Sequence, residues 1–220
     1  MVPGKPRWFA AGREQKIVEL STWVGSMETL TPEILLQKYR VPPDGAEAPP
    51  LCGIENIPWA KLSHAHGASH DVPALLRAAL SSNQDHQEFA LILLCETIWH
   101  QGTVYEATAY AVPFLFRMLE WSNTPDKRGI AVLLAGIADG YGAWAQPARQ
   151  AVGEQLPLLY PYLSDPDSSL YVGRGLAHYP ERADQIVPLL KTVLAAMEDR
   201  ETADELKKGI AKLEQAISEM

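Results

Sequence analysis

A proline followed by a short apolar run recurs along this chain at intervals typical of stacked helical repeats. The four copies begin at Val72, Val112, Leu156 and Val187, and their prolines lie 40, 44 and 31 residues apart. Repeats of this length cannot bury an apolar face alone and become stable by packing on their neighbours. The spacing therefore predicts an all-α chain built as a stack of helical pairs, whose biochemistry depends on surface residues.

The composition fits one globular unit. The chain has 220 residues, of which 47% are apolar and 21% charged, so it has ample material for a core. No apolar run approaches the roughly 18 residues that a membrane span needs, and residues 1–8 lack the apolar segment of a secretory signal. Cys52 and Cys95 are far apart in the sequence, which favours reduced thiols. We therefore expect a cytoplasmic protein that does not enter the membrane.

Acidic residues outnumber basic ones, most strongly in the middle of the chain. The net charge is −8 at pH 7, and residues 78–126 alone carry a net charge of −5. An acidic surface repels the phosphate backbone of nucleic acids and speeds association with a basic protein. The charge thus disfavours nucleic acid as a partner and favours another protein with a basic surface. Mild acidity also serves simply to keep proteins soluble, and that explanation stays open.

Capping residues and prolines divide the chain into helices. Thr31-Pro32 begins a short helix that ends near Tyr39, and residues 41–58 then hold too many prolines and glycines for regular structure. We predict that residues 41–58 form an irregular strap across the first helical pair, anchored by Trp59. The helices predicted after the strap span residues 70–81, 85–99, 104–120, 126–140, 147 to beyond 157, 167–178, 180 to beyond 188, and 203–218.

Three of these predicted helices contain an internal proline at a similar distance from their start. Pro113, Pro157 and Pro188 lie eight to ten residues after the residue that caps or opens the helix. An internal proline removes a backbone hydrogen bond and bends the helix. The recurrence therefore predicts bent helices that curve around their neighbours.

The last predicted helix is apolar on one side only. Its stripe runs along residues 203–217, and Thr202 with Glu205 forms a capping box at its start. A terminal helix that caps a stack needs one face on the stack and one face in water. We accordingly divide the chain into residues 1–58, a helical segment and strap, and residues 59–220, the helical stack with its capping helix, within one continuous unit.

Two stretches resemble the HEAT repeat family. Residues 156–167, Leu-Pro-Leu-Leu-Tyr-Pro-Tyr-Leu-Ser-Asp-Pro-Asp, look like the family's proline-containing helix and Asp-rich turn. Residues 57–115 resemble a bacterial HEAT-like subgroup, and the likeness as a whole covers residues 57–200. Tyr171 stands where the family has a basic residue after the turn, so its Asp–Arg ladder is incomplete here. The resemblance implies a right-handed α-solenoid of about four helical pairs and, for most members, protein–protein binding. It carries over no catalytic residue.

Three histidines within seven residues form the candidate metal site of the sequence. His64, His66 and His70, flanked by Asp71, have a spacing that could ligate zinc. The same residue types before a helix commonly accept hydrogen bonds from its free backbone N–H groups. His100 is the single further candidate for a metal ligand in the sequence. We therefore assign no metal and no cofactor, and retain these histidines as the candidates should a metal be bound.

The turn at residues 99–106 concentrates polar and aromatic side chains around Gly102. A histidine and a glutamate there could exchange protons near neutral pH, yet neither a nucleophile nor a cofactor motif accompanies them. Packing and capping explain most of the same residues, so we predict binding of a partner rather than catalysis. Two further residues, Glu120 and Trp121, lie at the far end of the next helix. The residues predicted to contact the partner are Trp99, His100, Gln101, Tyr105, Glu106, Glu120 and Trp121.

These features together favour a non-enzymatic protein-binding module whose concave helical face holds its partner. A small acidic protein of this kind also fits an immunity or antitoxin protein that covers the basic active site of a toxic effector. Two enzymatic alternatives stay open. One is a HEAT-based DNA-repair glycosylase, which needs a basic groove for DNA. The other is a metal-dependent hydrolase built on His64, His66 and His70.

Overall fold

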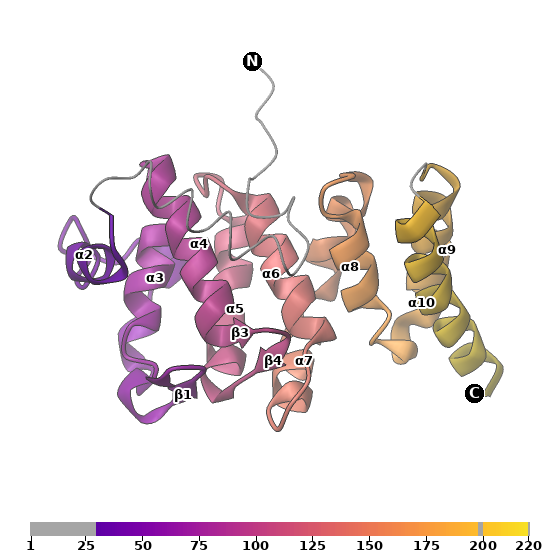
Figure 1. Ribbon diagram of the computed structural model, residues 1–220, viewed down its shortest axis with the longest axis horizontal. Coiled ribbons are helices and arrows are strands. Elements are labelled where there is room, and N and C mark those ends of the chain that lie inside the picture. The colour runs from indigo at the N-terminus through magenta and orange to yellow at the C-terminus, as the bar shows by residue number, and fades with distance from the viewer. Residues whose placement is uncertain (1–29, 198–199, 220) are drawn as a thin grey trace, which may run out of the picture.

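The computed structural model describes residues 30–197 and 200–219, and it confirms that the chain is mostly helical. Of the segment predicted at 1–58, residues 1–29 lie outside the described part. From α2 to α8 the helices follow one another along the long axis, and α9 and α10 lie together at the C-terminal end (Figure 1). Among the described helices, none is both long and apolar enough to cross a membrane. The α-helices are α2 (Pro32–Lys38), α3 (Val72–Ala79), α4 (Gln84–Ile98), α5 (Glu106–Glu120), α6 (Lys127–Asp139), α7 (Ala145–Gly153), α8 (Ser169–Leu176), α9 (Ala183–Ala195) and α10 (Arg200–Glu219).

Short elements connect these helices. The strands pair as two separate antiparallel hairpins, with Ser63 opposite Ala68 in the first and Trp99 opposite Val104 in the second. The 3₁₀ helices and strands are η2 (Pro49–Leu51), η3 (Ile54–Asn56), η4 (Trp59–Lys61), β1 (Ser63–His64), β2 (Gly67–Ala68), β3 (Trp99–His100), β4 (Thr103–Val104), η5 (Leu156–Ser164) and η6 (Pro180–Arg182).

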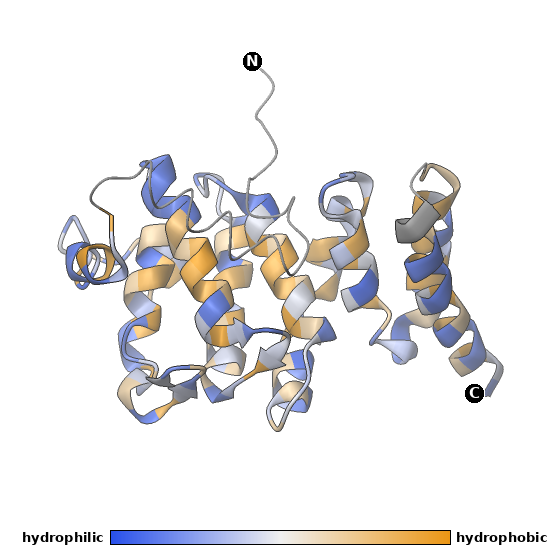
Figure 2. Ribbon diagram, viewed as in Figure 1, coloured by the Kyte–Doolittle hydropathy of each residue, from blue (hydrophilic) through white to orange (hydrophobic). Residues whose placement is uncertain are grey.

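Helix α6 lies at the centre of the core. All its residues from Gly129 to Ala138 are buried, and it packs against α5, α7 and α8. Small residues allow the closest of these contacts, because a Cβ atom on Gly175 of α8 would lie 2.6 Å from the carbonyl oxygen of Ala135. Figure 2 shows the apolar residues gathered on the central helices. Helix α4 is less completely buried, since some of its apolar residues, such as Ile92, are only half-buried.

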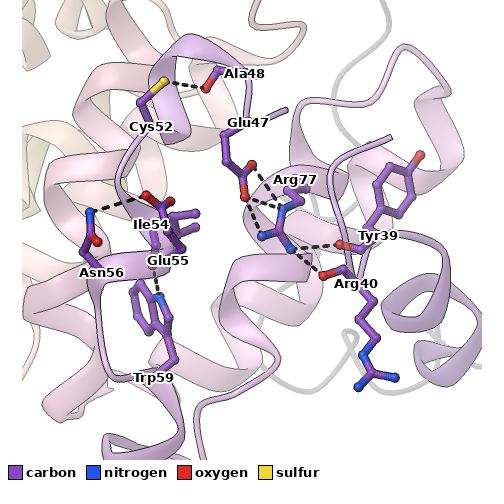
Figure 3. Close-up of polar contacts among 10 residues, drawn as sticks. All are labelled: Tyr39, Arg40, Glu47, Ala48, Cys52, Ile54, Glu55, Asn56, Trp59 and Arg77. Carbon is purple, nitrogen blue, oxygen red and sulfur yellow. Dashed lines mark hydrogen bonds and ion pairs between the residues drawn. The ribbon is translucent and has the colours of Figure 1, made fainter. Parts of the chain in front are cut away.

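Residues 41–58 are irregular, as predicted, and form bends, turns and two short 3₁₀ helices. The Arg77 guanidinium of α3 holds this strap by donating to the Glu47 carboxylate, with Nη2 and Oε1 2.5 Å apart (Figure 3). Its Nη1 atom donates to the carbonyl oxygens of Tyr39 and Arg40. Trp59 anchors the end of the strap as predicted, because its buried ring donates from Nε1 to the carbonyl of Ile54 at 2.8 Å.

Two helix boundaries predicted from capping patterns are wrong. The helix expected over residues 104–120 begins at Glu106, because Thr103 and Val104 form strand β4 of the second hairpin. Thr103 therefore does not cap α5, and the cap is instead Tyr105, whose backbone N–H donates to Thr108 Oγ1 at 2.8 Å. Likewise, helix α4 is capped by Asn83 rather than Asp85, since Asn83 Oδ1 accepts from the N–H of His86.

Two of the three prolines predicted to lie inside helices do so. Pro113 lies inside α5 and Pro188 inside α9, both on exposed positions. Pro157 does not bend a longer helix, because α7 ends at Gly153 and a separate 3₁₀ helix starts at Leu156. A proline in a first turn leaves no donor unpaired, so this position needs no bend.

The clamp between Glu47 and Arg77 generates a stability prediction. Both side chains are largely buried, with exposed fractions of 15% and 11%. Replacing Glu47 by glutamine removes the charge that faces the guanidinium, and we expect it to lower the free energy of unfolding by about 2 kcal/mol. Urea denaturation measures this change. The control is Glu55→Gln, an exposed carboxylate that bonds its neighbour Asn56, for which we expect a change within about 0.5 kcal/mol. Equal effects of the two variants would show that the clamp does not hold the strap.

Candidate functional site

The two hairpins and the turn between α6 and α7 are joined by backbone hydrogen bonds. We call residues 63–68, 99–106 and 140–144 the hairpin edge. The N–H of Ala65 donates to the carbonyl of Thr97, which ties the first hairpin to the end of α4. Tyr141 donates its N–H to the carbonyl of Gly102 and accepts from the N–H of Val104, each at 3.0 Å. Strands β1, β3 and β4 lie toward the lower side of the molecule in Figure 1.

Tyr141 is the most exposed large side chain on this edge, yet it is held in place. Its exposed fraction is 60%, and its hydroxyl donates to the carbonyl of Gln101 at 3.0 Å. The hairpin turn adopts positive φ at Gln101 (51°) and Gly102 (88°), which brings the backbone under the ring. A Cβ atom on Gly102 would lie 2.9 Å from Tyr141 Cε1. The sequence analysis missed Tyr141 as a site residue, although its position between Gly140 and Gly142 marks an exposed turn.

Of the predicted contact residues at this edge, Trp99 is half-buried and packs against the core. Its ring packs on α6, where a Cβ atom on Gly136 would lie 2.7 Å from Cζ2. Its Nε1 atom is buried with no hydrogen-bond partner. Tyr105 and Glu106 are half-buried, whereas Gln101 is exposed. Gln101 and Glu106 thus keep side-chain surface for a partner, whereas part of the Trp99 ring is taken up by its packing on α6.

His100 joins the two hairpins through its imidazole ring. Its Nδ1 atom lies 3.0 Å from Glu96 Oε2, one turn earlier on α4. On its other side the ring meets that of His66 in a T-shaped contact, with centroids 5.5 Å apart. His66 belongs to the first hairpin, so two segments that are 34 residues apart in sequence lie together here.

The candidate metal histidines are not arranged as a ligand set. His64 is buried, its Nε2 atom lies 2.8 Å from Asp71 Oδ1, and its Nδ1 accepts the N–H of His66. Both ring nitrogens are therefore engaged. His66 turns toward His100, and His70 is exposed. Within the described residues, no group of three or more His, Cys, Asp or Glu side chains could hold a metal ion.

Glu120 and Trp121 lie at the far end of α5 from the hairpin edge. The 14 residues between Glu106 and Glu120 correspond to about 21 Å along a helix, close to four turns. Both glutamates therefore face the same side. We call Glu106, Tyr110, Pro113, Arg117 and Glu120 the accessible stripe of α5. Arg117 is occupied in the fold, since its Nη1 donates to the carbonyl of Cys52 and its guanidinium lies 4.3 Å from the Phe114 ring centre.

A second polar cluster joins α6 to α8. Asp139 accepts from Arg174 Nη2 at 2.6 Å and lies 2.9 Å from His178 Nε2. Burial alone would raise the pKa of Asp139, but the hydrogen bond with His178 and the charge of Arg174 outweigh it and leave the pKa lowered. With α10, these residues border a cleft of about 230 Å³ that also contains Glu205 and Lys208. The charged groups there are mostly paired with one another, so we assign this cluster to the packing of α6, α8 and α10.

An ion pair also links the start of α6 to the turn before α8. Arg128 lies 2.8 Å from Asp167 and 3.5 Å from Asp165. Asp126, at the equivalent place in the preceding turn, caps α6 by accepting the N–H of Gly129 at 2.9 Å. The position taken by Tyr171 is thus not needed for an acid–base contact between these two helices.

The pair of His64 and Asp71 generates a pH-dependent prediction. Burial would raise the pKa of Asp71, but the hydrogen bond and charge of His64 lower it below the usual 3.8. The stabilisation from ionised Asp71 is therefore present above pH 3.8 and is lost as the pH falls through the lower folded-state pKa.

We expect Asp71→Asn to lower the free energy of unfolding by about 1 kcal/mol at neutral pH. The difference from the wild type should shrink as the pH falls below 3.8. Urea denaturation over a pH series measures both effects, with Asp44→Asn on an exposed turn as the control. A difference that stays constant across the series would contradict the assignment.

The contact between Gly102 and Tyr141 generates a second prediction. Gly102 and Gly45 both have positive φ, 88° and 72°, but a Cβ atom on Gly45 would meet nothing within 4 Å. Alanine at either position adds backbone strain, whereas alanine at position 102 also collides with the tyrosine ring. We expect Gly102→Ala to destabilise the protein by at least about 1 kcal/mol more than Gly45→Ala. Chemical denaturation of both variants measures the difference, and equal losses would mean that the ring is not held by this turn.

Comparison of this chain with models of known protein families, with curated proteins and with solved structures finds no match. The resemblance to HEAT repeats therefore stays a prediction.

Proposed function

We propose that this protein is a non-enzymatic binding module for another protein, and that the hairpin edge and the accessible stripe of α5 form its contact surface. In this proposal the helices pair as a right-handed, HEAT-like solenoid of about four units. The observation that carries it is Tyr141, a large aromatic side chain that is 60% exposed but fixed at both its backbone and its hydroxyl.

Exposed aromatic residues concentrate near this tyrosine. Within the described residues, the exposed aromatic side chains are Tyr110 at 41%, Tyr141 at 60% and Trp144 at 36%. They belong to α5 and to the turn that precedes α7, and α7 packs against α5. Tyrosine and tryptophan are enriched at the energetic centres of protein interfaces, because they bury a large area and lose little conformational entropy.

Rigidity supports binding as well. Ordering a loop on association costs free energy, and a turn that is already hydrogen bonded avoids that cost. Tyr141 is bonded to Gly102 and Val104, and the hairpin itself is tied to α6 through Trp99. The exposed groups at this edge are therefore presented in one arrangement.

Charge favours a basic partner. Glu106 and Glu120 stand on the accessible side of α5, and neither forms an ion pair within the described part of the chain. Acidic groups at the border of an interface steer a basic partner and raise its association rate. A protein of this charge and size suits the neutralisation of a basic effector, and we place an immunity or antitoxin role within the proposal as its specific form.

Site-specific crosslinking in the native host tests the surface. A photoreactive amino acid at position 144 should capture a discrete partner. The same amino acid at Ile217, which is similarly exposed on α10 at the far end of the molecule, should not. Capture of the same partner from both positions, or from neither, would contradict the proposed surface.

Charge reversal on α5 tests the steering. We expect Glu106→Lys with Glu120→Lys to slow association with the captured partner about tenfold and to weaken the dependence of the rate on salt. Stopped-flow measurement at two salt concentrations follows both quantities. The control is Glu154→Lys, an exposed carboxylate at the end of α7. Unchanged association kinetics in the double variant would mean that the two glutamates of the accessible stripe face solvent and do not steer the partner.

A further inference from the structure

His66 and His100 bring two imidazole rings together from hairpins that are far apart in sequence. Their ring centroids lie 5.5 Å apart, and the ring planes meet at 71°. The sequence analysis grouped His66 with His64 and His70, whereas the structure places it against the histidine of the second hairpin. Imidazole is the commonest protein ligand of transition metals, so the two hairpins together offer metal-binding chemistry that neither offers alone.

A hydrogen bond to Glu96 leaves one ring nitrogen of His100 available to a metal. Nδ1 lies 3.0 Å from Glu96 Oε2, and an ionised carboxylate can only accept a hydrogen bond, so Nδ1 carries the proton. In the neutral ring, Nε2 then holds the lone pair that binds a metal, and within the described residues it has no hydrogen bond. Metal-ligating histidines typically donate from their second ring nitrogen to a carboxylate in this way.

The first hairpin holds His66 by its backbone and leaves its ring unbonded. The N–H of His66 donates to Nδ1 of the buried His64 at 2.9 Å. The preceding residue, Ala65, donates to the carbonyl of Thr97 at 3.0 Å, which ties the first hairpin beside the second. The exposed ring of His66 makes no hydrogen bond in the described part of the chain. It is therefore presented to His100 with both ring nitrogens unengaged.

The separation of the two rings suits one shared metal ion. A zinc–imidazole bond is about 2.1 Å long and the ring centre lies about 1 Å behind the nitrogen, so two imidazoles at a tetrahedral angle have centres about 5 Å apart. The observed 5.5 Å is close to this value, and a small rotation of the exposed His66 ring closes the difference. The carboxylate of Glu96, which is 45% exposed, adds negative charge beside the pair and favours a cation.

We propose that His66 and His100 together bind one divalent transition-metal ion, with Glu96 positioning the His100 ring. The inference is independent of the proposed protein-binding function and differs from the three-histidine site predicted from the sequence. Two imidazoles supply half of a tetrahedral set, and because the described residues offer no group of three ligands, water fills the remaining positions. Such a site selects zinc, nickel or copper over magnesium, which prefers oxygen ligands.

Isothermal titration calorimetry of the untagged protein with Zn²⁺ provides the test, with Mg²⁺ as the comparison ion. We expect one zinc ion per chain and no measurable binding of magnesium at the same concentrations. His66→Ala and His100→Ala should each weaken zinc binding at least about tenfold, because a single imidazole holds the ion poorly. The control is His70→Ala, which removes an exposed histidine of the same segment and should leave the affinity unchanged.

Absence of zinc binding, unchanged affinity in either variant of the pair, or an equal loss in His70→Ala would overturn the inference. Variants of Glu96 test how His100 is positioned. Glu96→Ala should weaken zinc binding about tenfold, whereas Glu96→Gln, whose amide oxygen still accepts from Nδ1, should recover most of the affinity. The same affinity in both Glu96 variants would contradict the positioning role.

A measurement on the wild type guards against a fold defect in the variants. Substoichiometric Cu²⁺, a paramagnetic ion with high affinity for imidazole, should broaden the NMR signals of the His66 and His100 ring protons before those of His70 and His86. Broadening of all four rings at the same copper concentration would contradict a specific site. Failure of the metal site leaves the protein-binding proposal standing, because that proposal makes no use of a metal.

Discussion

The structure depends on the complete burial of α6. A helix that is apolar on every side is stable only where other elements surround it, and α5, α7 and α8 meet this need. Glycines set how close these neighbours come. Gly136 lets the Trp99 ring lie against α6, and Gly175 lets α8 approach the backbone at Ala135. The tight contact at Gly136 fixes the start of the second hairpin, so packing in the core determines where the hairpin edge stands.

The hairpin edge combines local and long-range constraints. Locally, positive φ at Gln101 and Gly102 turns the chain back within two residues. At long range, the turn after α6 pairs with this hairpin through Tyr141, about 40 residues later in the sequence. Their combination presents an exposed aromatic ring on a rigid backbone, which is the physical basis of the proposed role in binding.

Some polar side chains of this protein form all their hydrogen bonds within the fold, and others can still bond a ligand. Arg77 gives its donors to Glu47 and to two backbone carbonyls, and His64 uses both ring nitrogens within the fold. Neither side chain is therefore free to act on a ligand. Glu106, which has no such partner within the described residues, keeps its capacity for interaction. The distinction lies in hydrogen-bond partners rather than in residue type, because buried polar groups are bonded in nearly all native structures.

The sequence by itself determined the helical class, the strap at 41–58, the role of Trp59, and the prolines inside α5 and α9. These features follow from local rules of capping, proline chemistry and periodic apolar residues. Only the tertiary structure decided that residues 99–104 form a hairpin, since two-residue strands leave too short a pattern to read and are held by contacts with α6 and Tyr141. It also separated Trp99, a packing residue, from Gln101 and Glu106, because the three share one turn and differ only in what each side chain meets across the fold.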